Sequence, residues 1–248
     1  MDCFGFLQRK KAEGKIKHIG FSYHDDAQTL KEILTDHPET EMVQLQLNYI
    51  DWDDESVQSR KCYEICAEHN IDVVVMEPLK GGSLVSLPQT AADILKNANP
   101  NASIASWGIR FAATPDKVMV VLSGMGNMEQ MNDNISYMKE FVPLADKEME
   151  TLKQTVELIR SGIAIPCTAC RYCTESCPKR IAIPEYFALY NNQKQFRLLP
   201  GLVSNYANLT VKYGTPKDCI GCKKCESNCP QHILITDELK IVAEAYGN

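Results

Sequence analysis

The 248-residue chain has no long uninterrupted apolar stretch and no excess of basic residues. A membrane-spanning helix needs about 18 or more consecutive apolar residues, so the sequence predicts no membrane segment. The N-terminus places basic residues after a short apolar patch, the reverse of a secretory signal. The net charge of −6, with both signs well mixed, argues against nucleic acid as a partner. We therefore expect a soluble, cytoplasmic protein that binds neither membranes nor nucleic acid.

Cysteine, in contrast, is plentiful: the chain has eleven, and eight of them fall in two short groups. In a reducing compartment such grouping favours metal binding over disulfides. Both groups follow the spacing Cys-x2-Cys-x2-Cys-x3-Cys-Pro. The first run contains Cys167, Cys170, Cys173 and Cys177, and the second contains Cys219, Cys222, Cys225 and Cys229.

This spacing is that of bacterial ferredoxins with two [4Fe–4S] clusters. Three close cysteines wrap one cubane cluster, and the fourth reaches the neighbouring cluster. The alternative is a pair of structural zinc sites, but zinc motifs usually combine two Cys-x2-Cys units. Basic side chains beside the loops, such as Arg171, Lys179 and Lys223, suit the negative charge of thiolate-bound clusters. The predicted ligand sets are Cys167, Cys170, Cys173 and Cys229 for one cluster, and Cys177, Cys219, Cys222 and Cys225 for the other.

The first 145 residues alternate between apolar strands and helical patterns. Such alternation indicates a parallel sheet covered by helices, either doubly wound or a (β/α) barrel. Only four strands are found, whereas a closed (β/α)8 barrel needs eight. The predicted strands are 16–22, 42–48, 72–79 and 117–124, and the helices between and after them include 25–36, 54–70 and 127–140.

Four segments resemble, in order and spacing, strands five to eight of the aldo-keto reductase barrel: EGKIKHIGFS, VQLQLNYID, VVVMEPLKGGSL and VMVVLSGMGNMEQMNDNI. Residues 141–248 resemble the ferredoxin-like tail of one branch of that family. The resemblance implies an α/β fold with a partial (β/α) barrel over residues 1–145. A mostly α-helical ferredoxin-like domain with two [4Fe–4S] clusters is expected over residues 146–248.

The resemblance also implies a site for NAD(P)H at the C-terminal ends of the strands. Ser22 and Gln44 match positions that contact the nicotinamide carboxamide. Met76 stands where the family often has a tyrosine that stacks on nicotinamide, and Leu79 lies beside the expected pyrophosphate path. The family's basic residues for the 2′-phosphate have no clear equivalent, so NADP preference has no support. The segment matching the adenine-nucleotide site contains Ser123, Gly124, Met125, Asn127, Gln130 and Asn134.

The family's catalytic Asp, Tyr, Lys and His lie on its first four strands, and none can be assigned in this chain. The sequence begins at a point resembling the helix before strand five. Two explanations stay open: a fragment of a longer reductase, or a half-barrel that has lost catalysis. Because an open half-barrel exposes two sheet edges, we expect either a missing N-terminal half or self-association through those edges.

The predicted function is an iron–sulfur oxidoreductase of the aldo-keto reductase type. Two clusters would transfer single electrons, coupled to a barrel that binds a nicotinamide nucleotide. A redox partner protein or a small carbonyl or alcohol substrate would act with it. The alternative is a non-catalytic electron carrier or scaffold with a vestigial barrel.

Overall fold

The computed structural model of the chain describes residues 2–55, 57–196 and 200–246. Contacts divide it into two compact units, Met1–Val85 with Ala92–Val156, and Ser86–Ala91 with Glu157–Asn248. None of the helices formed by the described residues has the length and apolar character needed to cross a membrane.

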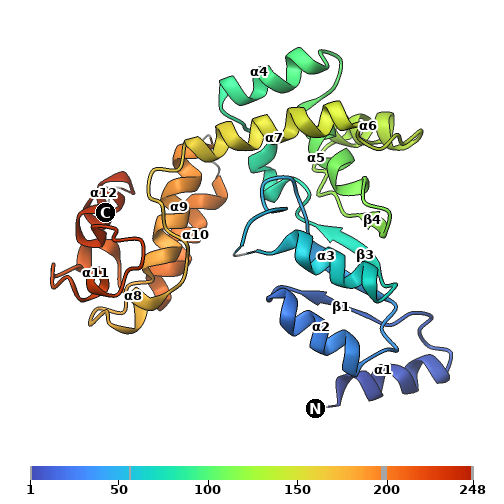
Figure 1. Cartoon of the computed structure of the whole chain (residues 1–248), viewed down its shortest axis with the longest axis horizontal. Coiled ribbons are helices and arrows are strands. Elements are labelled where there is room, and N and C mark those ends of the chain that lie inside the picture. Colours follow the sequence, from blue (N-terminus) through green and yellow to red (C-terminus); the bar gives the residue numbers. More distant parts are fainter. Residues whose placement is uncertain (1, 56, 197–199, 247–248) are drawn as a thin grey trace. The chain divides into compact units, whose positions relative to one another are not determined.

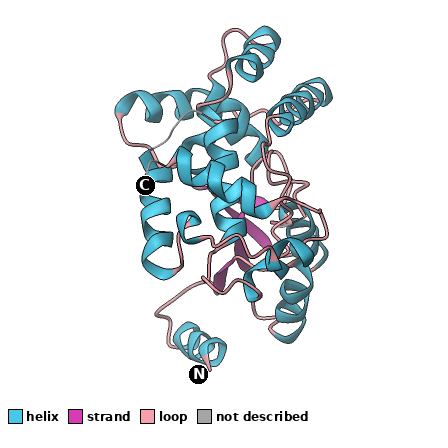
Figure 2. Ribbon diagram, turned by 90° about the vertical axis from the view of Figure 1, so that its left-hand side faces the viewer, coloured by secondary structure: helices cyan, strands magenta, loops and turns pink. Residues whose placement is uncertain are grey.

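The first unit contains a parallel sheet in the order β1-β2-β3-β4, whose strands are magenta in Figure 2. In the register of this sheet Ser22 lies opposite Gln44, and Gln44 lies opposite Val74. These half-buried or exposed residues share one face, whereas Val43 and Val73 on the other face are fully buried. The strands are β1 (Gly20–Tyr23), β2 (Met42–Gln46), β3 (Asp72–Met76) and β4 (Val118–Val121).

Helices α2 and α3 pack against each other, α3 contacts β2 and β3, and α5 contacts β4 (Figure 1). Side-chain caps fix where the helices begin: the Asp26 carboxylate accepts from the Thr29 N–H at 2.8 Å, and the Asn127 side chain accepts from the Gln130 N–H. The helical elements of this unit's chain segment are α1 (Cys3–Ala12), α2 (Ala27–Asp36), α3 (Ser59–Glu68), η1 (Lys80–Val85), α4 (Gln89–Ala98), α5 (Ile104–Ala113), α6 (Met128–Met138) and α7 (Asp146–Ser161).

The expected partial barrel is confirmed, and each of the four predicted strands is present. Several predicted boundaries differ: the strands expected to end at 48, 79 and 124 end at Gln46, Met76 and Val121, and the two largest differences are at the starts of elements. The first strand begins at Gly20, not at 16, because the Ile19 N–H donates to the Glu41 carboxylate at 2.9 Å instead of joining the sheet. The helix predicted from residue 54 begins at Ser59, after Gln58 in a left-handed conformation.

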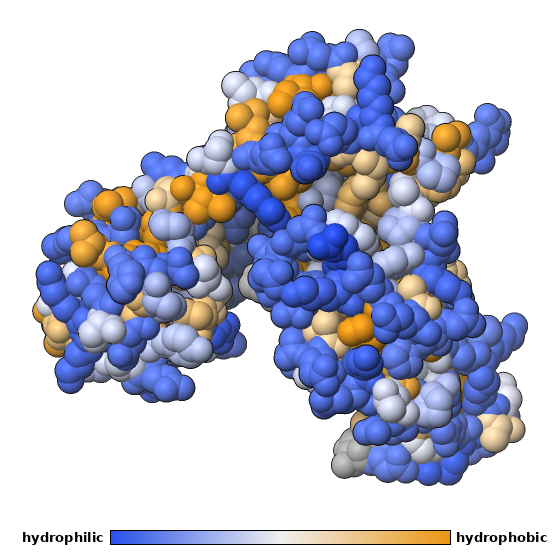
Figure 3. Space-filling view, in the orientation of Figure 1, coloured by the Kyte–Doolittle hydropathy of each residue, from blue (hydrophilic) through white to orange (hydrophobic). Residues whose placement is uncertain are grey.

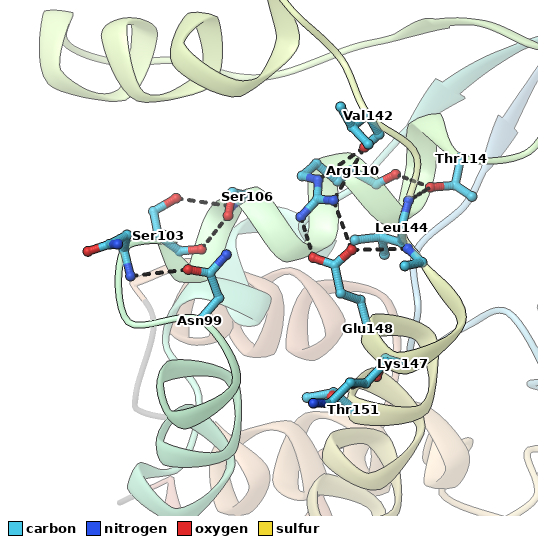
Figure 4. A network of polar contacts seen from close by, with 12 residues as sticks. Asn99, Ser103, Ser106, Arg110, Thr114, Val142, Leu144, Lys147, Glu148 and Thr151 are labelled. Atoms are coloured by element: carbon cyan, nitrogen blue, oxygen red, sulfur yellow. Dashed lines mark hydrogen bonds and ion pairs between the residues drawn. The ribbon is translucent and has the colours of Figure 1, made fainter.

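An ion pair ties α5 to the first turn of α7 (Figure 4). The Arg110 guanidinium contacts both carboxylate oxygens of Glu148, at 2.7 and 3.0 Å, and also donates to the Val142 carbonyl. Glu148 in turn accepts from the Ala145 N–H at the start of α7. This network fixes the C-terminal part of the unit against α5.

The second unit is mostly helical, as predicted. Its core includes apolar residues of three helices, among them Phe187, Leu202 and Val242, with Tyr206 stacked on Tyr246 at a ring distance of 4.4 Å. The elements are α8 (Tyr172–Glu175), α9 (Ile183–Gln195), α10 (Pro200–Lys212), η2 (Pro216–Asp218), α11 (Lys224–Ser227) and α12 (Ile235–Ala245).

Candidate functional sites

Four cysteine side chains line one cavity in the second unit, which we call the first cavity. Apolar side chains, including Ile183, Phe187 and Ile233, form the rest of its wall. The cavity volume is about 10 Å³. The cysteines are Cys167, Cys170, Cys173 and Cys229.

The remaining four cysteines of the two runs line a second cavity of about 10 Å³. Ile181 and Leu239 lie in its wall, and Ile183 lines both cavities. The fourth cysteine of each run therefore faces the other run's cavity, which is the grouping expected from the spacing. Cluster binding by these thiols stays a prediction. The cysteines of the second cavity are Cys177, Cys219, Cys222 and Cys225.

The backbone of the two runs repeats position by position. Each run contains a short helix, α8 or α11, and adopts a left-handed conformation at three equivalent positions. Such turns let three thiols of one loop converge. The equivalent pairs are Ala169 and Gly221 (φ 55° and 67°), Arg171 and Lys223 (65° and 58°), and Arg180 and His232 (52° and 53°).

The central thiol of each run is buried, Cys173 at 7% exposure and Cys225 at 6%. Burial raises the pKa of Cys173 to about 12 and that of Cys225 to about 11. A thiolate at either position needs positive charge beside it, which iron supplies. The Ile181 N–H donates to the Cys177 sulfur at 3.5 Å, a bond that stabilises a thiolate ligand.

Across the described residues, no group of three or more His, Cys, Asp or Glu side chains converges as it would around a single ion. The run cysteines instead surround two spaces with apolar walls. Eight thiols in two sets of four match the ligand number of two [4Fe–4S] clusters. The donor set therefore fits these clusters.

The first unit contains a larger cavity of about 790 Å³, within the usual range for small-molecule sites. It lies beyond the C-terminal ends of β3 and β4 and beside α5 and α6. We call it the strand-end cavity. Its wall includes the predicted residues Met76, Leu79, Ser123, Gly124, Met125, Gln130 and Asn134.

Hydrogen bonds order the β4–α6 wall of the strand-end cavity. The Asn134 amide donates to the Ser123 hydroxyl at 2.9 Å, and the Tyr137 hydroxyl donates to the Asn134 carbonyl oxygen. The Gly126 N–H donates to the Gln130 side chain at 2.7 Å. Polar groups are thereby held at one end of a cavity whose other walls are apolar.

Three of the predicted nucleotide residues lie outside this cavity's wall. Asn127 caps α6, and exposed Ser22 lies opposite Gln44 in the register of β1 and β2. The Gln44 amide contacts the Met76 sulfur at 3.4 Å, which links it to the wall through β3.

The resemblance placed Glu77 beside the pyrophosphate path, but the sequence did not single out several other wall residues. Ile104 and Ala105 come from the start of α5, and only the fold reveals that α5 faces this space. Glu77 and Asp133 add two carboxylates, and among the described residues no Lys or Arg lines the cavity.

Apolar side chains are exposed around the same end of the sheet. Figure 3 shows apolar surface around α6. Met119 on β4 is 54% exposed and Met128 on α6 is 66% exposed. This surface follows from the open side of the sheet at β4, which pairs with β3 alone among the described strands.

Comparison with known proteins supports both parts of this description. The sequence model of the Aldo/keto reductase family matches residues 1–157, and that of the 4Fe-4S dicluster domain matches residues 166–234. No curated protein gives a significant match.

Among solved structures, the chain resembles the aldo-keto reductase AKR11C1 from Bacillus halodurans with a TM-score of 0.50 at 20% identity. The match covers 61% of this chain and 54% of that one. The thermostable aldo-keto reductase Tm1743, solved with the inhibitor epalrestat, gives 0.50 at 21% identity, over 61% of this chain and 53% of that one.

The chain thus spans about half the length of these solved structures, and at such identity the likeness shows the fold alone. The family match extends over more than half of the chain and agrees with the parallel sheet observed in the first unit. The chain belongs to the aldo/keto reductase family and has a 4Fe-4S dicluster domain at its C-terminal side.

Proposed function

We propose that the chain forms the nucleotide-binding and electron-transfer part of an iron–sulfur oxidoreductase of the aldo-keto reductase type. One observation supports this above all: a single chain combines two four-cysteine cavities with a strand-end cavity in an aldo/keto reductase fold. Nicotinamide nucleotides transfer two electrons as hydride, whereas each cluster transfers one.

In the second unit, eight thiolates would hold two [4Fe–4S] clusters, which accept and release single electrons. Ile183 lines both cavities and is 1% exposed, so it excludes water between them. The Ile181 N–H stabilises negative charge on the Cys177 sulfur. Both effects influence reduction potential through solvent access and hydrogen bonding.

In the first unit, NAD(P)H would occupy the strand-end cavity. Gly81 and Gly82 have positive φ values of 61° and 92°, and open space surrounds both, so the backbone can approach a phosphate. Ser123 and Asn134 offer polar contacts at the α6 side. Among the described residues no Lys or Arg lines the cavity to pair with a 2′-phosphate, so NADP preference has no support here either.

The second candidate is an electron carrier or scaffold without turnover. This candidate is favoured because none of the family's catalytic residues, Asp, Tyr, Lys and His, can be assigned among these residues. In this case the strand-end cavity binds a nucleotide weakly or not at all, while the clusters still exchange electrons with a partner.

Anaerobic purification followed by iron, sulfide and zinc analysis tests the clusters. About eight iron and eight sulfide per chain are expected. Stoichiometric zinc with little iron would contradict the cluster assignment. Titration with NADH and NADPH separates the two candidates: saturable nucleotide binding supports the oxidoreductase part, and clusters without nucleotide binding support the carrier.

The open sheet edges also lead to an expectation. Among the described strands, β1 pairs with β2 alone and β4 with β3 alone. Unpaired strand edges promote association. We expect this chain by itself to self-associate, which sedimentation velocity over a range of protein concentrations measures; a monomer at all concentrations would contradict that expectation.

A further inference from the structure

The two thiol cavities are related by the repeat of the runs, yet their surroundings differ in charge. Lys179 and Lys223 line the second cavity, and their chain neighbours Arg180 and Lys224 are exposed. We call these four residues the basic rim. The equivalent positions at the first cavity are, in the same order, Gln231, Arg171, His232 and Tyr172.

At the first cavity, Arg171 is the one Lys or Arg among the four equivalent residues, and it already forms an ion pair. The Arg171 guanidinium lies 2.7 Å from a Glu185 carboxylate oxygen. By contrast, no residue of the basic rim has an ion-pair partner within 4.0 Å in the described part of the chain. The repeat therefore places free positive charge at the second cavity alone.

Acidic residues near the second cavity have other partners. The Asp218 carboxylate accepts from the Thr215 N–H and hydroxyl at 2.7 and 2.9 Å, which caps η2. The Glu226 carboxylate accepts from the Thr236 N–H and hydroxyl at 2.9 and 2.6 Å. Asp237 pairs with Lys240 at 2.8 Å. No basic-rim side chain therefore forms an ion pair with these carboxylates, although Lys179 and Lys223 interact with them at longer range.

Neutralising the clusters does not explain the difference between the cavities. With the same four-thiolate ligand set, each cavity would contain the same cluster charge. If the basic rim served only to offset that charge, its equivalents at the first cavity would also be basic. The asymmetry therefore indicates a function outside the chain.

The mouth of the second cavity also has an apolar centre. Ile220 lines the cavity and is 61% exposed, and Cys222 next to Gly221 is exposed as well. The position equivalent to Ile220 at the first cavity is Thr168. An apolar centre within a charged rim is the general pattern of protein interfaces, including small transient ones.

We propose that the basic rim and Ile220 form the docking surface for an acidic one-electron carrier protein. This inference rests on the proposed function, since it needs a cluster in the second cavity. Each docking event exchanges one electron: the carrier is reduced by one electron as this chain is oxidised by one, or the reverse. Charge complementarity selects an acidic partner.

The regional charge agrees with this assignment. Residues 166–234 contain nine Lys or Arg and four Asp or Glu, although the whole chain has a net charge of −6. The positive charge is thus concentrated in the cysteine-containing region. A carrier with a negative surface is attracted to this region and repelled by the rest of the chain.

The test uses the full chain with both clusters, an acidic flavodoxin as the probe and basic cytochrome c as the counter-probe. The test variant is Lys179→Gln with Lys224→Gln. The matched control is Gln231→Glu with Tyr172→Glu, which changes the net charge equally at the equivalent positions of the first cavity. Dissociation constants are measured by titration calorimetry at low and high salt. Iron content and the electron paramagnetic resonance spectrum confirm that both variants keep their clusters.

We expect the test variant to weaken flavodoxin binding about tenfold or more at low salt, and the control to weaken it less than about threefold. High salt should remove the difference because it screens exposed charges. Equal weakening in both variants, tighter binding of cytochrome c than of flavodoxin by the unaltered chain, or no flavodoxin binding at all would overturn the proposal.

Two further outcomes would assign the basic rim to another occupant. Salt-sensitive self-association that is lost in the test variant would identify a second copy of this chain, whose remaining surface is acidic. Rim-dependent binding of anionic vesicles in place of flavodoxin would identify a lipid surface. Either outcome can occur with intact clusters, so it is distinguishable from failure of the proposed function, which appears as missing iron.

Discussion

The Lys80 ammonium lies 2.7 and 2.9 Å from the two carboxylate oxygens of Asp51, whose side chain is almost fully buried. The same carboxylate accepts from the Gln46 and Asn48 amides, each at 2.8 Å. Lys80 follows β3 and lies between Leu79 and Gly81, two residues of the strand-end cavity wall. Its backbone is left-handed, with a φ of 48°. The ion pair therefore fixes the position of a loop that forms the cavity wall.

Lys80→Met should destabilise the first unit by about 2–4 kcal/mol, since it leaves a buried carboxylate without its cation. Urea unfolding followed by tryptophan fluorescence measures this, because both tryptophans, Trp52 and Trp107, lie in this unit. Lys61→Met is the control: its partner Glu55 is exposed, so the cost should stay below about 1 kcal/mol. Equal costs would contradict the assigned role of Asp51.

Asn134→Ala should weaken nucleotide binding about three- to tenfold, the value of one or two hydrogen bonds. The change removes the bond to Ser123 and a polar group of the strand-end cavity. Fluorescence titration with NADH measures it. Ser136→Ala is the control on the same helix, since its hydroxyl bonds the Asp133 carbonyl and does not line the cavity. An unchanged affinity for Asn134→Ala would place the nucleotide elsewhere.

The two strongest patterns in the sequence agree with the structure for physical reasons. The fold could be anticipated because apolar strands and helices alternate, and a parallel sheet buries such strands on the helix-covered face. The grouping of the thiols could be anticipated because Cys177 lies too far along the chain from the three close cysteines to join them, and the fourth cysteine of such a run reaches the neighbouring cluster.

Other features could not be anticipated. The Asp51–Lys80 pair joins residues far apart in the sequence, and neither belongs to a recognisable motif. The contribution of Ile104 to the strand-end cavity depends on where α5 lies. The start of β1 at Gly20 depends on a side chain of another segment, Glu41. Long-range contacts of this kind leave no periodic signal.

The fourth cysteine of each run lies in the other run's cavity, so two double cysteine variants should differ in their iron content. Cys177→Ser with Cys222→Ser removes two ligands from the second cavity and should leave about four iron per chain. Cys177→Ser with Cys170→Ser removes one ligand from each cavity and should leave markedly less. Iron analysis and resonance spectra measure both. If each run held its own cluster, the two results would be exchanged.

Ala169→Gly should stabilise the second unit by about 0.5–1 kcal/mol. Alanine at a φ of 55° is strained by about 1–2 kcal/mol, and glycine relieves this at some entropic cost. The reciprocal change Gly221→Ala should destabilise by a similar amount, since its φ is 67°. The denaturant midpoint for loss of the cluster absorbance measures both under anaerobic conditions. Changes of the same sign would contradict the equivalence of the two positions.

The Arg110–Glu148 pair should give a pH-dependent contribution to stability. Hydrogen bonding to Arg110 lowers the pKa of Glu148 from its ordinary value of 4.5. A lowered folded-state pKa means that the contribution is full above pH 4.5 and is lost as the pH falls through the folded-state value. Glu148→Gln should therefore cost about 1 kcal/mol at neutral pH, after allowance for solvent screening.

Tryptophan fluorescence during urea unfolding of both proteins, at pH 7 and at several acidic values, measures this difference. The two unfolding curves should approach each other only in the acidic range. A difference that grows as the pH falls would have the wrong sign for this ion pair.

Because Cys229 completes the first cavity, that cavity lacks one ligand during synthesis until residue 229 has been made. The second cavity, although its three close cysteines come later, has its remaining ligand, Cys177, already made. The first cavity can therefore receive a complete ligand set only after the second run of cysteines has been synthesised. A chain that terminates just before residue 229 would keep every ligand of the second cavity and lose one from the first.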